Sequence, residues 1–188
     1  MNKDRYLVVV SAPSGCGKDT VVGTMRAKHP EIALSVSATS RPPRGEEQEG
    51  VHYYFLTEEQ FMDKVEADEM AEYARYGSKL YGTPRSEIEP RMEQGQTVVL
   101  IIEVPGAARI RARYPGALTV FLMPPSMEVL EARLRGRGTD SEESIQKRLA
   151  EARTEMEQAP LYTATLVNDD LQVCADELYR LICEHQSK

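Results

Sequence analysis

The sequence predicts an α/β fold in which helices cover both faces of a parallel β-sheet. Short apolar runs that are typical of buried strands alternate with helical segments along most of the chain. Residues 97–102 are almost continuously apolar, as expected of a central parallel strand that is buried on both faces. A glycine-rich turn separates the first apolar run from the first helical segment, which is the usual place for a phosphate-binding loop.

Local patterns give the expected elements in order. Apolar and β-branched runs between turn residues predict strands at 6–11, 32–36, 51–56, 71–76, 97–102, 117–123 and 164–167. Helical patterns with start and stop residues predict helices at 20–28, 57–67, 84–94, 107–114, 127–134, 141–159 and 171–184. Thr57 and Gln60 resemble a capping box, Ser126 is expected to cap the helix after it, and Gly95 to end another.

Composition limits the class of protein. The 188 residues suit one domain, and 41% of them are apolar, which is enough for a core. No run approaches the ~20 apolar residues of a membrane span, and the short apolar stretch near the N-terminus predicts a strand rather than a signal peptide. The three cysteines show no metal-binding spacing and fit reduced thiols. We therefore expect a cytoplasmic protein.

The charge distribution favours small anionic ligands over nucleic acid. The net charge of −7 argues against general nucleic-acid binding. Arginines nevertheless gather beside glycine and proline at Arg41 and Arg44, and again between Arg133 and Arg148. Such local cationic clusters on an acidic chain suit a small phosphorylated ligand, although some arginines are expected to be ordinary surface residues.

The strongest motif is the segment Ser11-Ala-Pro-Ser-Gly-Cys-Gly-Lys-Asp-Thr20, which follows a strand and opens a helix. Gly15 and Gly17 can adopt positive φ, so that backbone N–H groups and the helix N-terminus hold phosphate oxygens. Lys18 supplies a cation at the β- and γ-phosphates of ATP. The predicted ATP-binding residues of this loop are Ala12, Pro13, Ser14, Gly15, Cys16, Gly17, Lys18, Asp19 and Thr20.

Two positions depart from the usual pattern of this loop. Ala12 replaces its first glycine, which is a small change, and Asp19 replaces the Ser or Thr after the lysine. Asp19 removes a hydroxyl that normally faces Mg²⁺, but a carboxylate can bind Mg²⁺ directly or through water. Asp19 can equally be an ordinary first-turn residue that gains from the helix dipole. Cys16 is interpreted as a small residue that fits the loop rather than as a reactive thiol.

Beyond this loop the chain resembles the guanylate kinases, which are P-loop kinases. The matching segments occur in the family's order and cover nearly the whole chain. They are Ser35-Val-Ser-Ala-Thr-Ser-Arg-Pro-Pro-Arg44, Gly50-Val-His-Tyr-Tyr-Phe55, Tyr81-Gly-Thr-Pro-Arg85, Pro124-Pro-Ser126, Arg135-Gly-Arg-Gly-Thr-Asp-Ser-Glu-Glu143 and Val167-Asn-Asp-Asp170. The resemblance implies transfer of a phosphoryl group from ATP to GMP or dGMP, with Mg²⁺ as the cofactor.

The resemblance also implies a three-layer P-loop kinase fold with three parts. The parallel core is expected at about 1–36, 95–134 and 160–188. An inserted mixed α/β subdomain that binds GMP is expected at about 37–94, and a small helical lid at about 135–159. All three parts belong to one domain that spans residues 1–188.

The GMP site is assigned by the same resemblance. Arg41, Arg44, Tyr53 and Tyr81 match positions that hold the GMP phosphate, which guanidinium forks and phenol hydroxyls suit chemically. Ser37, Glu72 and Thr83 match positions around the guanine. Glu72 would accept hydrogen bonds from N1–H and N2–H, which adenine cannot supply. Tyr54 and Phe55 are expected to pack in the core.

The resemblance places further arginines at the ATP phosphates. Arg137 and Arg148 match lid arginines, which together with Lys18 and Arg41 are the predicted catalytic residues. Arg133 is expected to stack near the adenine, Asn168 to contact the edge of the base, and Arg135 to lie at the surface.

The end of the central strand departs from the family. Guanylate kinases usually have two acids one residue apart there, followed by Gln-Gly, whereas this chain has Ile101, Glu103, Pro105 and Gly106. Loss of the first acid could weaken or broaden acceptor choice. Glu103 is assigned to the GMP site and, with Asp19, as a candidate Mg²⁺ ligand directly or through water. A strand-end acid without a role is the competing interpretation.

The expected partners are ATP and GMP or dGMP, without nucleic acid or membrane, and a homodimer is left open. Two other functions compete with this one. The Gly-Lys-Asp sequence of the loop resembles ribose 1,5-bisphosphate phosphokinases, which are related enzymes with another acceptor. A guanylate-kinase-like module that binds proteins without catalysis is a rival of another class, although such modules tend to lose phosphate-binding residues.

Overall fold

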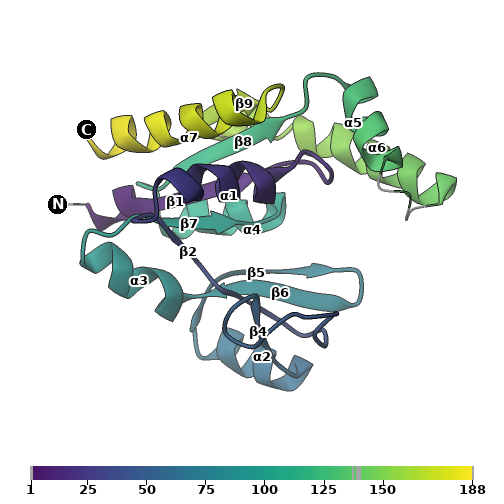
Figure 1. Ribbon diagram of the computed structural model, residues 1–188. Helices are drawn as coiled ribbons and strands as arrows, with labels where there is room; N and C mark the ends of the chain where they lie inside the picture. Colours follow the sequence, from purple (N-terminus) through teal and green to yellow (C-terminus); the bar gives the residue numbers. More distant parts are fainter. Residues whose placement is uncertain (1, 137, 139–140, 188) are drawn as a thin grey trace. The chain divides into compact units, whose positions relative to one another are not determined.

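The computed structural model describes residues 2–136, 138 and 141–187 (Figure 1). Strands and helices alternate along most of the chain in it, as the sequence predicts. The strands are β1 (Leu7–Ser11), β2 (Ala33–Leu34), β3 (Ser37–Thr39), β4 (Tyr53–Phe55), β5 (Met70–Tyr76), β6 (Lys79–Pro84), β7 (Val98–Ile101), β8 (Leu118–Met123) and β9 (Ala164–Val167). The α-helices are α1 (Lys18–Lys28), α2 (Glu58–Glu66), α3 (Arg85–Glu93), α4 (Val104–Arg113), α5 (Met127–Arg135), α6 (Glu142–Met156) and α7 (Leu171–Gln186). Two short 3₁₀ segments are η1 (Lys3–Tyr6) and η2 (Ala159–Leu161).

The chain forms two compact units. Unit 1 contains the residues up to Val8 together with Ile32–Ala117, and unit 2 contains Val9–Glu31 and the chain from Leu118 onward. Strand β1 begins in unit 1 and ends in unit 2. The predicted boundaries of the core, the acceptor-binding region and the lid stay predictions.

The predicted parallel sheet is confirmed. Its five strands have the order β2-β7-β1-β8-β9. Strand β2 runs parallel to β7, with Ala33 opposite Val98, and β8 runs parallel to β9, with Val120 opposite Ala164. Every residue of β1 is buried, as expected for four consecutive apolar residues followed by Ser11 in a strand that is covered on both faces. The carboxyl end of β1 leads directly into the phosphate loop.

Unit 1 also contains a second, mixed sheet of four strands in the order β4-β3-β6-β5. Strand β3 pairs parallel to β4, and β6 pairs antiparallel to both β3 and β5. Helix α2 packs on this sheet through Phe61, which is fully buried in a cluster with Ala38, Met70 and Leu80. The expected capping box begins α2, since Thr57 Oγ1 accepts from the Gln60 backbone and the Gln60 side chain accepts from the Thr57 backbone.

Strand β6 was not among the strands expected from the sequence, and it contains a glycine and a proline, which are both unfavourable inside a strand. Pro84 ends this strand and is also the N-cap residue of α3. Gly82 lies in its middle, where a Cβ atom would come within 2.6 Å of the Glu72 carbonyl oxygen and 3.1 Å of Phe61 Cζ. The glycine therefore allows close packing of β6 against β5 and α2.

In unit 2, α1 and α7 lie side by side (Figure 1). Lys28 pairs with Asp176 at 2.6 Å, and the His29 ring stacks on Tyr179 with centroids 3.4 Å apart. Helix α1 begins two residues before the predicted start, because Gly17 takes a left-handed conformation and serves as the N-cap.

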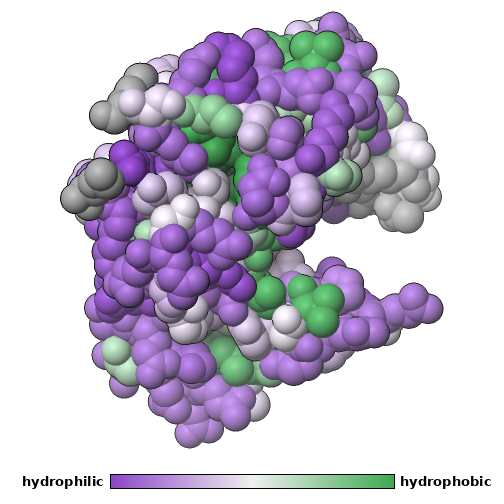
Figure 2. Space-filling view, turned by 60° about the vertical axis from the view of Figure 1, so that its left-hand side comes forward, coloured by the Kyte–Doolittle hydropathy of each residue, from purple (hydrophilic) through white to green (hydrophobic). Residues whose placement is uncertain are grey.

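The surface is mostly hydrophilic on the face shown in Figure 2, and hydrophobic residues appear there in small patches. Exposed large apolar side chains in the described part of the chain are Val51, Tyr76, Leu161, Val167 and Val173. None of the helices within residues 2–136, 138 and 141–187 combines the length and the apolar character needed to cross a bilayer.

Candidate functional site

The phosphate loop of unit 2 has the predicted backbone conformation. Gly15 and Gly17 have φ values of 96° and 81°, as expected where the chain must take left-handed conformations. The Cys16 amide donates to the Pro13 carbonyl at 3.1 Å, and the Val21 amide donates to the Gly17 carbonyl at 3.0 Å. A loop of this kind before a helix N-terminus presents backbone N–H groups to an anion.

The side chain of Asn168 supports the loop from behind. Asn168 is 6% exposed, and its Nδ2 donates to the Cys16 carbonyl at 2.7 Å. Arg133 in turn donates from Nη2 to the Asn168 carbonyl at 2.9 Å. Contacts of Asn168 and Arg133 with the ATP base stay predictions, and the structure gives both residues a role in holding the loop in place.

Helix α5 also packs against the loop. A Cβ atom at Gly15 would lie 2.8 Å from Leu134 Cδ2 and 3.2 Å from Leu130 Cδ1. Both leucines are fully buried, so they could not move aside cheaply. Gly15 is therefore fixed by packing as well as by its positive φ.

Cys16 is buried in the middle of the loop. Burial raises the pKa of its thiol to about 12, against the opposing charges of Arg133 and Lys18. The thiol is consequently protonated near neutral pH and is a poor nucleophile. This agrees with the interpretation of Cys16 as a small residue that fits the loop.

Other predicted ATP-site residues lie on or near the loop. Lys18 and Asp19 form the first turn of α1, with Lys18 half-buried and Asp19 exposed. Arg148 of α6 has its Nη1 3.5 Å from Ser14 Oγ, so this helix brings an arginine to the loop. Ala12 and Pro13 are buried, and Thr20 is exposed. Arg137 lies outside the described residues.

A cationic centre in unit 1 contains Arg41, whose side chain is 7% exposed. Its guanidinium donates to both oxygens of Glu47, at 2.6 and 2.7 Å, and lies 4.9 Å from the centre of the Tyr53 ring. The ion pair raises the pKa of Arg41 and lowers the pKa of Glu47 to about 2. Arg41 is thus already arranged to bind an oxyanion through two parallel hydrogen bonds.

The other residues predicted to hold a phosphate surround this centre. The Tyr53 and Tyr81 rings meet edge to face, with centroids 6.2 Å apart. The backbone N–H of Arg44 donates to the same Glu47 carboxylate at 2.8 Å, and the Arg44 residue is exposed. The structure therefore brings Arg41, Tyr53 and Tyr81 together, and links Arg44 to them through Glu47.

Glu72 of β5 and Thr83 of β6 form a buried polar pair. The two residues are opposite each other in the antiparallel ladder, and Thr83 Oγ1 donates to Glu72 Oε1 at 2.8 Å. Glu72 is 4% exposed, and burial raises the pKa of its carboxyl to about 7, although Thr83 and Arg109 act in the opposite direction. A buried carboxyl of this kind suits recognition of paired N–H donors.

The remaining acceptor-site candidates lie at strand ends. Ser37 is half-buried at the start of β3. Ile101 ends β7, and Glu103 is the N-cap residue of α4, whose first turn contains Pro105. Ile101 and Glu103, which occupy the positions of the family's two acids, therefore lie where β7 meets α4.

Three residues with close contacts to predicted site residues were not assigned to the site from the sequence. Glu47 binds Arg41, Gly106 packs on Glu72, and Arg109 influences the pKa of Glu72. An acid six residues after Arg41 could have suggested the first. The contacts of Gly106 and Arg109 depend on how α4 meets β5, which local patterns do not specify.

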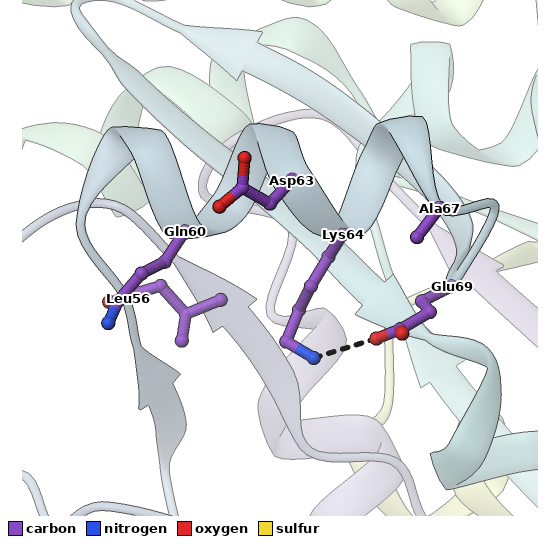
Figure 3. Close-up of a pocket in the computed structure, with 6 residues that line it drawn as sticks. All are labelled: Leu56, Gln60, Asp63, Lys64, Ala67 and Glu69. Carbon is purple, nitrogen blue, oxygen red and sulfur yellow. Dashed lines mark hydrogen bonds and ion pairs between the residues drawn. The ribbon is translucent and has the colours of Figure 1, made fainter.

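Two of the surface cavities in unit 1 differ in the residues that line them. A cavity of about 380 Å³ is lined by Glu72 and Tyr73 from β5 and by Arg109 and Arg113 from α4. The guanidinium of Arg109 lies 4.0 Å from the centre of the Tyr73 ring. Figure 3 shows the second cavity, which lies along α2 and where Lys64 pairs with Glu69 at 2.8 Å. None of the six residues drawn there is a predicted site residue.

Comparison with known proteins gives consistent results. The model of the guanylate kinase family matches residues 4–185. A guanylate kinase from Synechococcus sp. (strain JA-3-3Ab) is 49% identical over 176 residues, which cover 94% of this chain and 81% of the relative. One from Thermosynechococcus vestitus is 49% identical over 166 residues, covering 88% and 87%.

Solved structures support the same fold. The crystal structure of guanylate kinase from Anaplasma phagocytophilum has a TM-score of 0.77 at 28% identity and covers 97% of this chain and 86% of that one. A shikimate kinase from Bacteroides thetaiotaomicron has a TM-score of 0.51 at 15% identity, which shows a likeness of fold alone.

Proposed function

The chain belongs to the guanylate kinase family, and on that premise we propose that it transfers the γ-phosphoryl group of ATP to GMP or dGMP. The products are ADP and GDP or dGDP. The observation that carries the proposal is that unit 1 contains both the cationic centre of Arg41, Tyr53 and Tyr81 and the buried Glu72–Thr83 pair. These two features match the phosphate and the base of a purine monophosphate.

Each end of GMP has a chemically suitable partner. The phosphate would bind Arg41, Arg44, Tyr53 and Tyr81. At Arg41 it would either displace the Glu47 carboxylate from the guanidinium or bind the guanidinium together with it. Glu72 would accept hydrogen bonds from guanine N1–H and N2–H. A base without these donors would leave a buried carboxyl unpaired, which is costly.

ATP would bind at the loop of unit 2. The amides around Gly15 and Gly17 and the N-terminus of α1 would hold its phosphates, with Lys18 as the nearby cation. Arg148 reaches the same loop. Arg137 is assigned to the phosphates by sequence alone.

The transfer would be direct and in line. An anionic phosphate oxygen of GMP attacks the γ-phosphorus, a new P–O bond forms, and the bond to the β-phosphate oxygen breaks to release ADP. This oxygen already carries negative charge, so that the protein need not supply a general base. Alignment and charge stabilisation by Lys18, Arg41, Arg137 and Arg148 would provide the catalysis.

The residues of the loop are compatible with Mg²⁺ that is held mainly by the nucleotide. Within the described part of the chain no three His, Cys, Asp or Glu side chains form a metal-binding group. Mg²⁺ often takes its ligands from phosphates, water and one or two carboxylates. The exposed Asp19 beside Lys18 can supply a carboxylate, and Glu103 is the second candidate. When bound, Mg²⁺ would neutralise charge on the phosphates.

Substitution of Lys18 tests the nucleotide site. Lys18→Ala should lower turnover by at least about a hundredfold, because a cation at the transferring phosphate is lost. Lys28→Ala is a matched control, because Lys28 is the last residue of the helix that Lys18 begins and pairs with Asp176. Both variants should keep the far-UV circular dichroism of the natural chain. Unchanged turnover in Lys18→Ala would overturn the assignment.

A coupled assay with four acceptors tests the substrate. Asp19 after Lys18 is the observation that favours the rival acceptor, ribose 1,5-bisphosphate. We expect GMP and dGMP to be phosphorylated, and AMP and ribose 1,5-bisphosphate to be poor substrates. Use of ribose 1,5-bisphosphate without use of GMP would favour the rival kinase. No detectable ATP binding by calorimetry with Mg²⁺ would instead favour a non-catalytic module.

The proposed setting follows from these substrates. We propose that the protein acts in the cytoplasm, where ATP and GMP are available, and without nucleic-acid or membrane partners, as its net charge of −7 favours. The homodimer stays an open prediction.

A further inference from the structure

Gly106 lies in the first turn of α4, at the contact between this helix and Glu72 of β5. We propose that Gly106 is a positioning residue that determines base specificity, because its missing side chain leaves the space in which the Glu72 carboxylate must lie. The inference rests on the proposed function, in which Glu72 recognises guanine. It adds a residue that does not itself contact the base.

The space at Gly106 is filled by the carboxylate. A Cβ atom added there would lie 2.3 Å from Glu72 Oε2 and 3.1 Å from Glu72 Cδ. Non-bonded carbon and oxygen atoms do not approach to 2.3 Å, so either the helix or the carboxylate would have to move. The next atom that the new methyl group would meet is Ile102 Cδ1, at an ordinary 3.5 Å.

The carboxylate cannot move without losing its arrangement. Glu72 is 4% exposed, and its other oxygen, Oε1, accepts the 2.8 Å hydrogen bond from Thr83. A carboxylate is rigid and planar, so a shift of Oε2 away from α4 also turns or withdraws Oε1. The pair of oxygens that would accept from N1–H and N2–H is therefore displaced as a unit.

The backbone gives no other reason for glycine at this position. Gly106 lies within α4, where right-handed helical φ and ψ suit any residue and alanine is normally favoured over glycine. Gly15 and Gly17 differ in this respect, because their φ values are positive. The explanation for Gly106 is therefore found in its neighbour rather than in its own conformation.

The experiment compares Gly106→Ala with Gly23→Ala. Gly23 is also a helical glycine, in α1, and a Cβ atom there would meet no atom of the described residues within 4 Å. Steady-state kinetics with GMP, IMP and ATP are measured for both variants and the natural chain, together with the thermal midpoint. IMP is informative because it has N1–H but lacks the N2 amino group.

The expected result is a selective loss. In Gly106→Ala the KM for GMP should rise at least about tenfold, which corresponds to the loss of one hydrogen bond to a charged acceptor. The preference for GMP over IMP should fall, the KM for ATP should stay within about twofold, and the thermal midpoint should not fall by more than a few degrees. Gly23→Ala should match the natural chain in all KM values.

Two outcomes would overturn the proposal. One is a Gly106→Ala variant with the natural KM for GMP and the natural preference over IMP. The other applies if Gly106→Ala proves unstable, and it is tested with the double variant Glu72→Ala, Gly106→Ala. The double variant lacks the carboxylate that the new methyl group would contact, so its thermal midpoint should equal that of Glu72→Ala alone. A midpoint that stays low would place the damage elsewhere than Glu72.

The same measurements separate this inference from the proposed function. If the natural chain did not phosphorylate GMP, the proposed function would fail before any variant is compared. The thermal midpoints of the single and double variants would still show whether Gly106 makes room for Glu72.

Discussion

The buried carboxyl of Glu72 should make the unliganded protein less stable as the pH rises. Its pKa is about 7 in the folded protein, against an ordinary value of 4.5. Between these two values the folded state binds more protons than the unfolded state, so the free energy of unfolding falls as the pH increases through this window. At pH 7 the folded-state carboxyl is about half ionised, and the loss is nearly complete about one pH unit higher, where both states are ionised.

The magnitude follows from the pKa difference. A difference of about 2.5 in pKa corresponds to about 3 kcal/mol when the carboxyl is fully ionised in both states. At about pH 5 the same relation gives less than about 1 kcal/mol, because the carboxyl is still mostly protonated in the folded state. Thr83 and Arg109 are the neighbours that favour the ionised form, and burial outweighs them.

Glu72→Gln isolates this effect. The substitution keeps the shape of the side chain and an oxygen that can accept from Thr83, but it removes the titrating group. Urea unfolding near pH 8 should therefore show the variant to be more stable than the natural chain by up to about 3 kcal/mol, with a difference below about 1 kcal/mol near pH 5. The stabilised variant should at the same time phosphorylate GMP poorly.

Glu87→Gln serves as a control with the opposite sign. The Glu87 carboxylate accepts from Tyr54 at 2.7 Å and pairs with Arg91 at 2.8 Å, and its pKa is lowered because these bonds outweigh burial. Its contribution to stability is present above the unfolded pKa and is lost as the pH falls. Loss of Glu87 should therefore destabilise the protein to nearly the same extent near pH 8 and near pH 5, because both values lie above the ordinary pKa of 4.5, and the destabilisation should shrink only at lower pH. If Glu72→Gln gave the same stability difference at both pH values, or lowered stability near pH 8, the reasoning would be refuted.

Three further predictions concern the phosphate loop and α2. Asn168→Ala leaves the buried Cys16 carbonyl without its 2.7 Å hydrogen bond, and should cost about 1–3 kcal/mol in urea unfolding and raise the KM for ATP more than that for GMP; an unchanged KM for ATP would contradict it. Thr57→Ala removes the cap that binds the Gln60 amide and should cost about 1 kcal/mol without changing either KM, so a shift in a KM would show a role beyond stability. Iodoacetamide on the native protein near neutral pH should modify the exposed Cys183 and spare the buried Cys16, whose pKa is raised to about 12; peptide mass spectrometry would reveal comparable labelling of both if this is wrong.

The phosphate loop could be predicted from the sequence because its structure depends on adjacent residues. Gly15 and Gly17 take the positive φ values that the motif requires, and Lys18 begins the helix that follows. The capping box of Thr57 was predictable for the same reason, since both partners lie in one turn. Local chemistry was sufficient in these cases.

The surroundings of the acceptor site could be predicted only in part. Glu72 and Thr83 were assigned separately, but their hydrogen bond depends on the pairing of β5 with β6, and β6 itself was missed. Glu47 was not assigned, although it binds both nitrogens at the end of the Arg41 side chain. Gly106 meets Glu72 only because α4 packs on β5. These contacts are tertiary, and no periodicity in the sequence encodes them.

Gly82 and Gly106 would carry different information in an alignment of relatives. Gly82 is demanded by the packing of β6 against Phe61 and the β5 backbone, so selection for folding alone should retain it, even in descendants that have abandoned nucleotide chemistry. Gly106 is demanded by the carboxylate at position 72. Its replacement by larger residues should therefore accompany loss of that acid, and the two positions should change together during divergence.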